Sequence, residues 1–292
     1  MRPARPFPPD ADSRYSGVMP GTKDMLDELD AFLLELNRAA ADVILPVFRN
    51  AAQLSMEDKG TVGAFDPVTA ADRGAEAAIR KHVAARYPDH GVLGEEYGAD
   101  RVDAEWVWVV DPIDGTRAFV AGLPVWTTLI GLRHQGRPVL GSIGQPVLGE
   151  VFIGRASGSR CVTAAGERPL RVRACARLAD AVIATTDPFK LLDERELAVW
   201  QRVQAGARFA RYGCDAYAYA MVAAGFVDLV AESSLKPWDI DAAVPVLQGA
   251  GGMVTDWSGR DIGTAGGQML IAGDRRLLDE VLPMTRPVAR AG

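Results

Sequence analysis

The stretch Trp108-Val109-Val110-Asp111-Pro112-Ile113-Asp114-Gly115-Thr116 decides both the fold class and the chemistry of this chain. It continues the apolar run 106–110, whose composition is typical of a fully buried β-strand. Acidic residues that follow such a strand emerge at a sheet edge, where α/β-type sheets usually hold their ligands. We therefore expect a ligand site at Asp111 and Asp114.

These two aspartates lie three residues apart, so a turn brings their carboxylates to one point. Two carboxylates in contact repel each other, and one of them must take up a proton unless a cation neutralises the pair. A hard divalent cation with oxygen ligands meets this need, and Mg²⁺ is the first candidate. The alternative is a capped turn, in which both aspartates accept hydrogen bonds from nearby N–H groups.

Further acidic segments stand elsewhere in the chain: DPVTAAD at 66–72, GEE at 94–96 and WDIDAA at 238–243. The first is a polar turn that leads into a helix, the second follows a short apolar segment, and the third opens a late helix. Helix capping explains any one of them alone, and it is the favoured interpretation for Asp241.

The composition excludes several classes of protein. The chain has 292 residues and a formal net charge of −6, so nucleic acid and anionic membrane surfaces are poor partners. No run approaches the roughly 18 apolar residues that span a bilayer, and the Pro-rich stretch 1–22 reads as a flexible tail rather than a secretory signal. The three cysteines lack C-x-x-C spacing. We expect a cytoplasmic protein.

Hydrophobic periodicity predicts a helix from Asp24 to Pro46 and a second helix over about 73–86. Segments 125–132, 138–144 and 149–154 are predicted to be consecutive antiparallel strands. After about residue 178, strands alternate with helices near 194–206, 215–224, 238–249 and 274–282; the strands are 181–185, 208–212, 226–231, 252–256 and 269–272. This rhythm predicts an α/β (α+β) fold with closely packed subdomains, 23–177 and 178–292.

Taken in order, DPVTAAD, GEE, WVVDPIDGT and WDIDAA resemble the motifs of the inositol monophosphatase family of Mg²⁺-dependent, lithium-sensitive phosphatases, over about residues 25–285. The resemblance implies a layered αβαβα sandwich and a homodimer that hydrolyses a small phosphate ester. It also implies two or three Mg²⁺ ions, with Mn²⁺ as the alternative ion. Lys59 belongs either to a third metal site of the family or to the solvated surface.

By motif position, the resemblance implies metal ligation by Glu95, Asp111, the carbonyl oxygen of Ile113, Asp114 and Asp239. Thr116 and Asp72 resemble the family's Thr/Asp pair, which works with Glu95 to orient or deprotonate the attacking water. The N–H groups of Gly115 and Thr116 would cradle the phosphate. Asp239 is also expected to contact the substrate.

Specificity is expected from the segments 211–217 and 231–233, which stand where the family contacts the non-phosphate part of the substrate. Asp215 and Glu232 would place two negative charges there. A cationic leaving group suits them, because unpaired buried carboxylates are costly. Histidinol phosphate carries an amine and an imidazole, and the runs 114–132 and 211–217 look most like the histidinol-phosphatase branch. The alternative for Asp215 is helix capping.

Other functions stay open at this point. An inositol-1-monophosphatase or a broad-specificity sugar or nucleotide phosphatase would use the same motifs. Bisphosphate substrates need extra cations, of which 211–217 offers only Arg211. A non-catalytic metal- or phosphate-binding regulator is the alternative of another class. A haloacid-dehalogenase-type enzyme is disfavoured, because neither acidic motif matches D-x-D-x-[TV].

Overall fold

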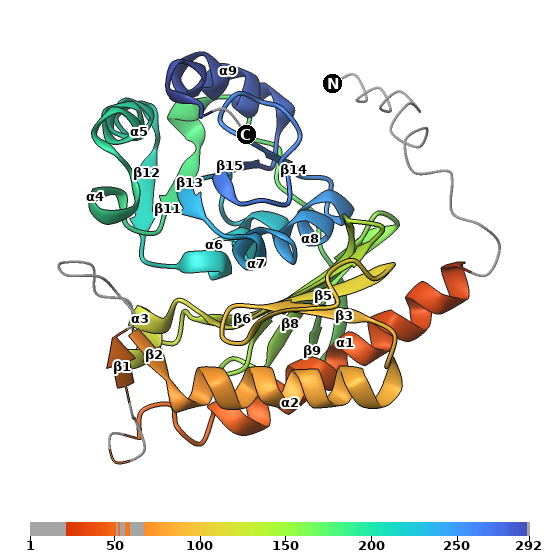
Figure 1. Cartoon of the computed structure of the whole chain (residues 1–292). Coiled ribbons are helices and arrows are strands. Elements are labelled where there is room, and N and C mark those ends of the chain that lie inside the picture. The colour runs from red at the N-terminus through yellow and green to blue at the C-terminus, as the bar shows by residue number, and fades with distance from the viewer. Residues whose placement is uncertain (1–21, 51, 53–55, 59–66, 291–292) are drawn as a thin grey trace.

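The structure is a computed structural model, and it describes residues 22–50, 52, 56–58 and 67–290. The predicted tail up to residue 21, as well as Lys59 and Asp66, lie outside the described residues. Within the described part of the chain, two β-sheets alternate with layers of helices (Figure 1).

The larger sheet has eight strands in the order β10-β9-β8-β7-β6-β5-β3-β4. They are β3 (Gly91–Gly94), β4 (Gly98–Asp100), β5 (Trp106–Asp114), β6 (Thr127–His134), β7 (Arg137–Gln145), β8 (Glu150–Arg155), β9 (Gly158–Thr163) and β10 (Gly166–Pro169). From β5 to β10 each strand is antiparallel to the next, whereas β3 is parallel to β5. The predicted antiparallel run is confirmed. It continues through β9 and β10, which the sequence did not predict because β10 is exposed throughout and carries no apolar pattern.

The smaller sheet has five strands in the order β12-β11-β13-β15-β14. They are β11 (Val182–Thr185), β12 (Phe209–Tyr212), β13 (Leu229–Leu235), β14 (Met253–Thr255) and β15 (Gly267–Ala272). Strand β11 is parallel to both of its neighbours, and β15 is antiparallel to β13 and β14. A separate antiparallel pair, β1 (Met56–Asp58) and β2 (Pro67–Thr69), precedes the larger sheet.

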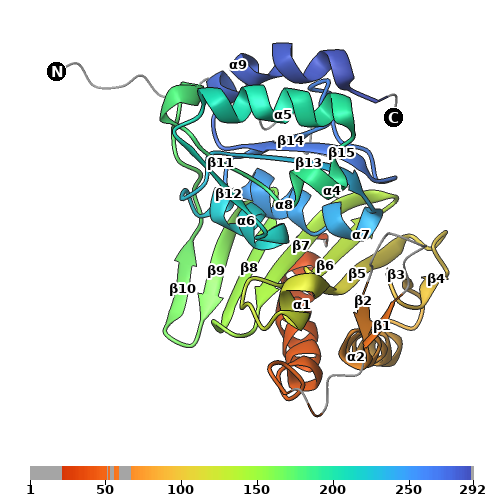
Figure 2. The same ribbon diagram turned by 90° about the vertical axis from the view of Figure 1, so that its left-hand side faces the viewer.

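Helices cover both sheets on both faces (Figures 1 and 2). The outer layers are α1 (Thr22–Ile44) and α2 (Ala70–Arg86) on the larger sheet, and α5 (Glu194–Gly206) and α9 (Arg275–Thr285) on the smaller. The middle layer consists of α6 (Asp215–Ala223), α7 (Pro237–Ile240) and α8 (Ala243–Gly249). Three clusters of buried apolar side chains fill the spaces between these layers. The αβαβα sandwich implied by the resemblance is confirmed.

The helix predicted at 238–249 is interrupted between α7 and α8. Pro245 has no N–H to donate to the carbonyl of Asp241 four residues earlier, and its ring crowds that carbonyl, so a continuous helix is disfavoured. Among the described residues, none of the helices combines the length and the apolar composition that crossing a bilayer requires.

Candidate active site

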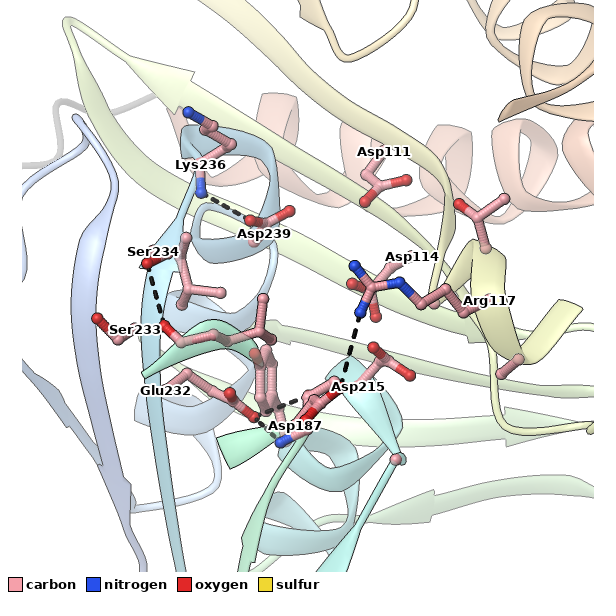
Figure 3. A pocket seen from close by; sticks show the side chains of 18 of the residues that line it. Asp111, Asp114, Arg117, Asp187, Asp215, Glu232, Ser233, Ser234, Lys236 and Asp239 are labelled. Carbon is pink, nitrogen blue, oxygen red and sulfur yellow. Dashed lines mark hydrogen bonds and ion pairs between the residues drawn. The ribbon is translucent and has the colours of Figure 1, made fainter. Parts of the chain in front are cut away.

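A cavity of about 820 Å³ opens between the two sheets. Its wall is built from the ends of β5 and β13, the short helices α3 (Thr116–Val120) and α4 (Pro188–Leu191), and α7 (Figure 3). The volume lies within the range of small-molecule sites, about 300–1,000 Å³. Polar side chains from both halves of the chain meet in it.

A β-bulge brings Asp111 and Asp114 to one side of the sheet. In β5, Asp111 pairs with Leu129 and Asp114 pairs with Thr127, so β5 has one residue more than β6 over this interval. Residues three apart in a regular strand point to opposite faces, and the extra residue reverses this. The sequence predicted a turn at this place. Instead the strand continues to Asp114, and the chain turns at Gly115, where φ is +84°.

The third acid comes from the other half of the chain. Asp239 lies on α7, and suitable oxygen atoms of Asp111, Asp114 and Asp239 are all within 4.8 Å of one another. Glu95, in the turn after β3, lines the same cavity, as does Ile113. The structure therefore brings together all the residues that were predicted to ligate metal.

Two acids hold the neighbouring elements in place. The carboxylate of Asp114 accepts a hydrogen bond from the N–H of Ala216 at 2.7 Å, so it caps the start of α6 across the cavity. Glu76 of α2 accepts from the N–H of Glu96 at 2.7 Å and from that of Tyr97 at 3.2 Å, and so fixes the turn that carries Glu95. Neither contact was predicted, because each joins segments far apart in the sequence.

Without a bound cation, the carboxyl groups of this site cannot all be ionised at neutral pH. Burial raises the pKa of Asp111 and of Asp114 well above the usual range, and the charges of Glu95 and Asp215, respectively, raise them further. Burial also raises the pKa of Asp239 to about 6, although the N–H of Lys236 donates to its carboxylate at 2.6 Å. Buried carboxylates without counter-charges favour a bound cation, and their oxygen donors suit a hard divalent ion.

The predicted water-activating residues have other partners in this structure. The hydroxyl of Thr116 donates to the carbonyl oxygen of Ile113 at 3.1 Å. Asp72 accepts from the N–H and the hydroxyl of Thr69 at 2.8 and 2.5 Å, completing a capping box at the start of α2. Burial raises the pKa of Asp72 to about 6. Asp72 is not among the cavity-lining residues that the structure describes.

Asp215 and Glu232 line the same cavity. Asp215 does not cap α6: the N-cap residue is Cys214, and a Cβ on Gly115 would lie 2.9 Å from the Asp215 carboxylate. Burial raises the pKa of Asp215 to about 6 and that of Glu232 to about 8. In the absence of a bound cation Glu232 therefore keeps its proton at neutral pH, which the sequence did not predict.

Sequence reasoning missed several residues of the cavity wall. Arg117 and Lys236 line it, and Arg117 forms a long ion pair of 4.0 Å with Asp187 (Figure 3). Arg211, the cation that the sequence singled out, is exposed and is not among the lining residues that the structure describes. Arg117 follows the DGT motif directly, and Asp187 follows the parallel strand β11, so both positions carried a usable signal.

The interpretation of Asp241 as a helix cap is wrong. Asp241 is fully buried, and both of its carboxylate oxygens accept hydrogen bonds from Arg133 of β6. The residue before α8 is Ala242, which has no side-chain cap. The local sequence resembles a cap, but the partner of Asp241 lies more than one hundred residues earlier.

An αβαβα sandwich with clustered carboxylates at the end of a buried strand is an arrangement suited to metal-dependent hydrolysis. The profile of the inositol monophosphatase family matches residues 25–287, and the chain belongs to that family. Its members are metal-dependent phosphatases that act on small phosphate esters, so this chain is a phosphoric monoester hydrolase.

Three relatives illustrate the similarity. The chloroplastic bifunctional phosphatase IMPL2 of Arabidopsis thaliana is 43% identical over 80% of this chain and 66% of its own length. A histidinol-phosphatase of Chlorobaculum parvum is 32% identical over 78% of this chain and 85% of its own. The solved structure of an inositol monophosphatase from Zymomonas mobilis has a TM-score of 0.78 and 34% identity, and covers 91% of this chain and 99% of its own.

The buried acids predict how stability depends on pH in the metal-free protein. Their pKa values are raised in the folded state, so the folded protein binds more protons than the unfolded one, and stability falls as pH rises from about 4 through 8. A pKa that is higher by 1 in the folded than in the unfolded protein corresponds to about 1.4 kcal/mol of unfolding free energy. We expect the melting temperature in EDTA to fall by roughly 5 °C or more between pH 5 and pH 8.

Mg²⁺ should restore the melting temperature that is lost at high pH, because the bound ion neutralises the carboxylates that have lost their protons. The gain in melting temperature on adding Mg²⁺ is therefore expected to be larger at pH 8 than at pH 5.5. Differential scanning fluorimetry with and without EDTA measures both effects. An equal gain at the two pH values would contradict the assignment of these acids to a cation site.

Proposed function

We propose that this enzyme hydrolyses histidinol phosphate to histidinol and phosphate, by attack of an activated water and with Mg²⁺ as its cofactor. One observation carries the choice of substrate. Asp215, which is half-buried, and Glu232, which is fully buried, line the same cavity as the carboxylates proposed to bind metal. The similarity to a histidinol-phosphatase supports the same substrate.

The metal is proposed to be held by Asp111, Asp114, Asp239, Glu95 and the carbonyl of Ile113. Bound divalent ions supply Lewis-acid chemistry: they lower the pKa of water and neutralise charge on the phosphoryl oxygens. The carbonyl of Ile113 already accepts from Thr116, but a carbonyl oxygen has a second lone pair and can ligate as well.

The proton of the attacking water is proposed to pass to the group formed by Glu95, Thr116 and Asp72. Thr116 can turn its hydroxyl hydrogen from the carbonyl of Ile113 toward the carboxylate that receives the proton, because a hydroxyl hydrogen rotates freely. Its oxygen lone pair is then free to accept a hydrogen bond from the water. The raised pKa of Asp72, about 6, places it in the range where a carboxylate accepts a proton near neutral pH.

The phosphate is proposed to lie over the N–H groups of Gly115 and Thr116, which line the cavity where Gly115 adopts a left-handed conformation. The Asp215 carboxylate lies next to Gly115. A leaving group attached to that phosphate therefore reaches Asp215 first and Glu232 behind it. A cationic amine would form an ion pair with Asp215. Its positive charge would also lower the pKa of Glu232, so that this carboxyl loses its proton.

Inositol-1-phosphate is the second candidate substrate, because the protonated carboxyl of Glu232 can donate to a neutral polyol. Arg117 and Lys236 line the cavity and supply the cations that a sugar or nucleotide bisphosphate would need. A non-catalytic regulator is disfavoured, since the complete set of metal carboxylates is kept. The homodimer, the cytoplasmic location and the choice between Mg²⁺ and Mn²⁺ stay predictions.

A phosphate-release panel tests the proposal. Purified enzyme is assayed with histidinol phosphate, inositol-1-phosphate, fructose bisphosphate and adenosine bisphosphate, each with Mg²⁺, with Mn²⁺ and with EDTA. We expect kcat/KM for histidinol phosphate to exceed the others by about 100-fold, which corresponds to one buried charged hydrogen bond of about 3 kcal/mol. Equal values for all four substrates would refute the assignment of Asp215 and Glu232.

A further inference from the structure

The segment that carries Asp239 lies directly on the strands of the larger sheet. Gly131, Gly141 and Gly154 are register partners across β6, β7 and β8, and form a row. A Cβ on Gly131 would lie 2.9 Å from Cβ of Asp241, and one on Gly141 would lie 2.2 Å from the carbonyl oxygen of Ala242. Only glycine leaves room for this approach.

An ion pair fastens the same segment to β6. The guanidinium of Arg133 donates to both carboxylate oxygens of Asp241, and its Nη2 also donates to the carbonyl of Thr264 at 3.0 Å. The side chain of Asp241 is fully buried and that of Arg133 is 15% exposed. A bidentate pair with this burial has one geometry, so it fixes direction as well as distance.

The Arg133–Asp241 ion pair lies close to the proposed metal ligands on both of the chain segments that it joins. Asp241 follows Asp239 by two residues, and Val109, which precedes Asp111 by two residues, is the register partner of Gly131. Helix α7 is only four residues long, and a helix of one turn does not hold its own shape. The position of Asp239 relative to Asp111 therefore depends on what holds α7 to the sheet.

We propose that the Arg133–Asp241 pair, seated on the glycine row, is a positioning device that sets the metal affinity of the site by holding Asp239 against Asp111 and Asp114. The inference rests on the proposed metal-binding role of Asp239. Asp241 itself is not a ligand, because both of its oxygens are bound to Arg133.

The test compares two matched substitutions in the full-length, metal-free protein. Arg133→Met breaks the pair with Asp241, and Arg173→Met breaks a similar bidentate pair with the fully buried Asp228. The hydrogen bonds of Arg173 go to Asp228 and not to α7, as far as the structure describes the chain. Binding of Mn²⁺ alone is measured by titration calorimetry or electron paramagnetic resonance. Both variants are expected to lose thermal stability, but only Arg133→Met should bind Mn²⁺ more weakly, by about 10-fold.

A second variant covers the case in which Arg133→Met does not fold. Replacing both partners with leucine removes the pair without leaving an uncompensated buried charge, which often preserves stability. This double variant is expected to keep its melting temperature and still to bind Mn²⁺ about 10-fold more weakly. Wild-type affinity in the double variant, or equal losses in Arg133→Met and Arg173→Met, would overturn the proposal.

Asp239→Asn separates failure of this inference from failure of the proposed metal site. If Asp239→Asn binds Mn²⁺ like the wild type, the metal site is wrong and the positioning role falls with it. If Asp239→Asn loses binding while the Arg133 variants keep it, the metal site stands and the positioning role alone is refuted.

Discussion

Asp111→Asn is expected to abolish Mg²⁺-dependent phosphate release and, at the same time, to stabilise the metal-free protein. The carboxylate lies in the acidic cluster with Asp114 and Asp239 and is buried, so its charge is available to a cation and costly without one. An amide keeps the shape but offers the cation a neutral oxygen. We expect kcat/KM to fall at least about 10³-fold, as when a main electrostatic element of an active site is removed.

The two opposite effects distinguish this outcome from simple unfolding. At pH 8 in EDTA the variant should melt at a higher temperature than the wild type, because a buried acid with a strongly raised pKa has been removed. Asp279→Asn is the matched control, since Asp279 forms an exposed ion pair with Arg275 on α9. The control should retain wild-type activity. Substantial turnover by Asp111→Asn would refute the metal site.

Asp215→Asn is expected to change the choice of substrate more than the rate. The kcat/KM for histidinol phosphate should fall about 100-fold, because a buried charged hydrogen bond is worth roughly 3 kcal/mol. The value for inositol-1-phosphate should change only a few-fold, because its leaving group is neutral. Asparagine is the right replacement here: Asp215 has a φ of +44°, and asparagine adopts this left-handed conformation at little cost.

Glu232→Gln provides an internal comparison. The pKa of Glu232 is about 8, so at pH 7 the carboxyl is mostly neutral and glutamine resembles it. As pH rises through 8 the wild-type carboxylate gains its charge, and the deficit of the variant on histidinol phosphate should grow. Initial rates at pH 6.5, 7.5 and 8.5 measure this trend. A loss in Asp215→Asn that is equal for both substrates would contradict the proposed contact with a cationic leaving group.

The proposed metal ligands could be found without a structure because each lies within a short motif. Asp111, Ile113 and Asp114 share one run of four residues, and GEE and WDIDAA supply the other acids. The antiparallel run and the later α/β alternation were also readable, since buried strands and amphipathic helices carry regular apolar patterns. The strand β10 could not be read, because exposed strands lack such a pattern.

What each acid touches could not be read from the sequence. Asp241 looked like a cap and is paired with Arg133, and Asp215 looked able to cap α6, which Asp114 caps instead. The bulge in β5 and the protonated state of Glu232 were equally hidden. All of these depend on groups brought together by the stacking of the layers.

The sequence by itself therefore determined the chemical groups of the site and the order of the elements that carry them. The tertiary structure decided which of these groups meet, how they are oriented, and which of them keep a proton. The physical reason is that spacing along one strand or helix turn constrains only near neighbours. Burial and the contacts between distant segments are properties of the packed layers as a whole.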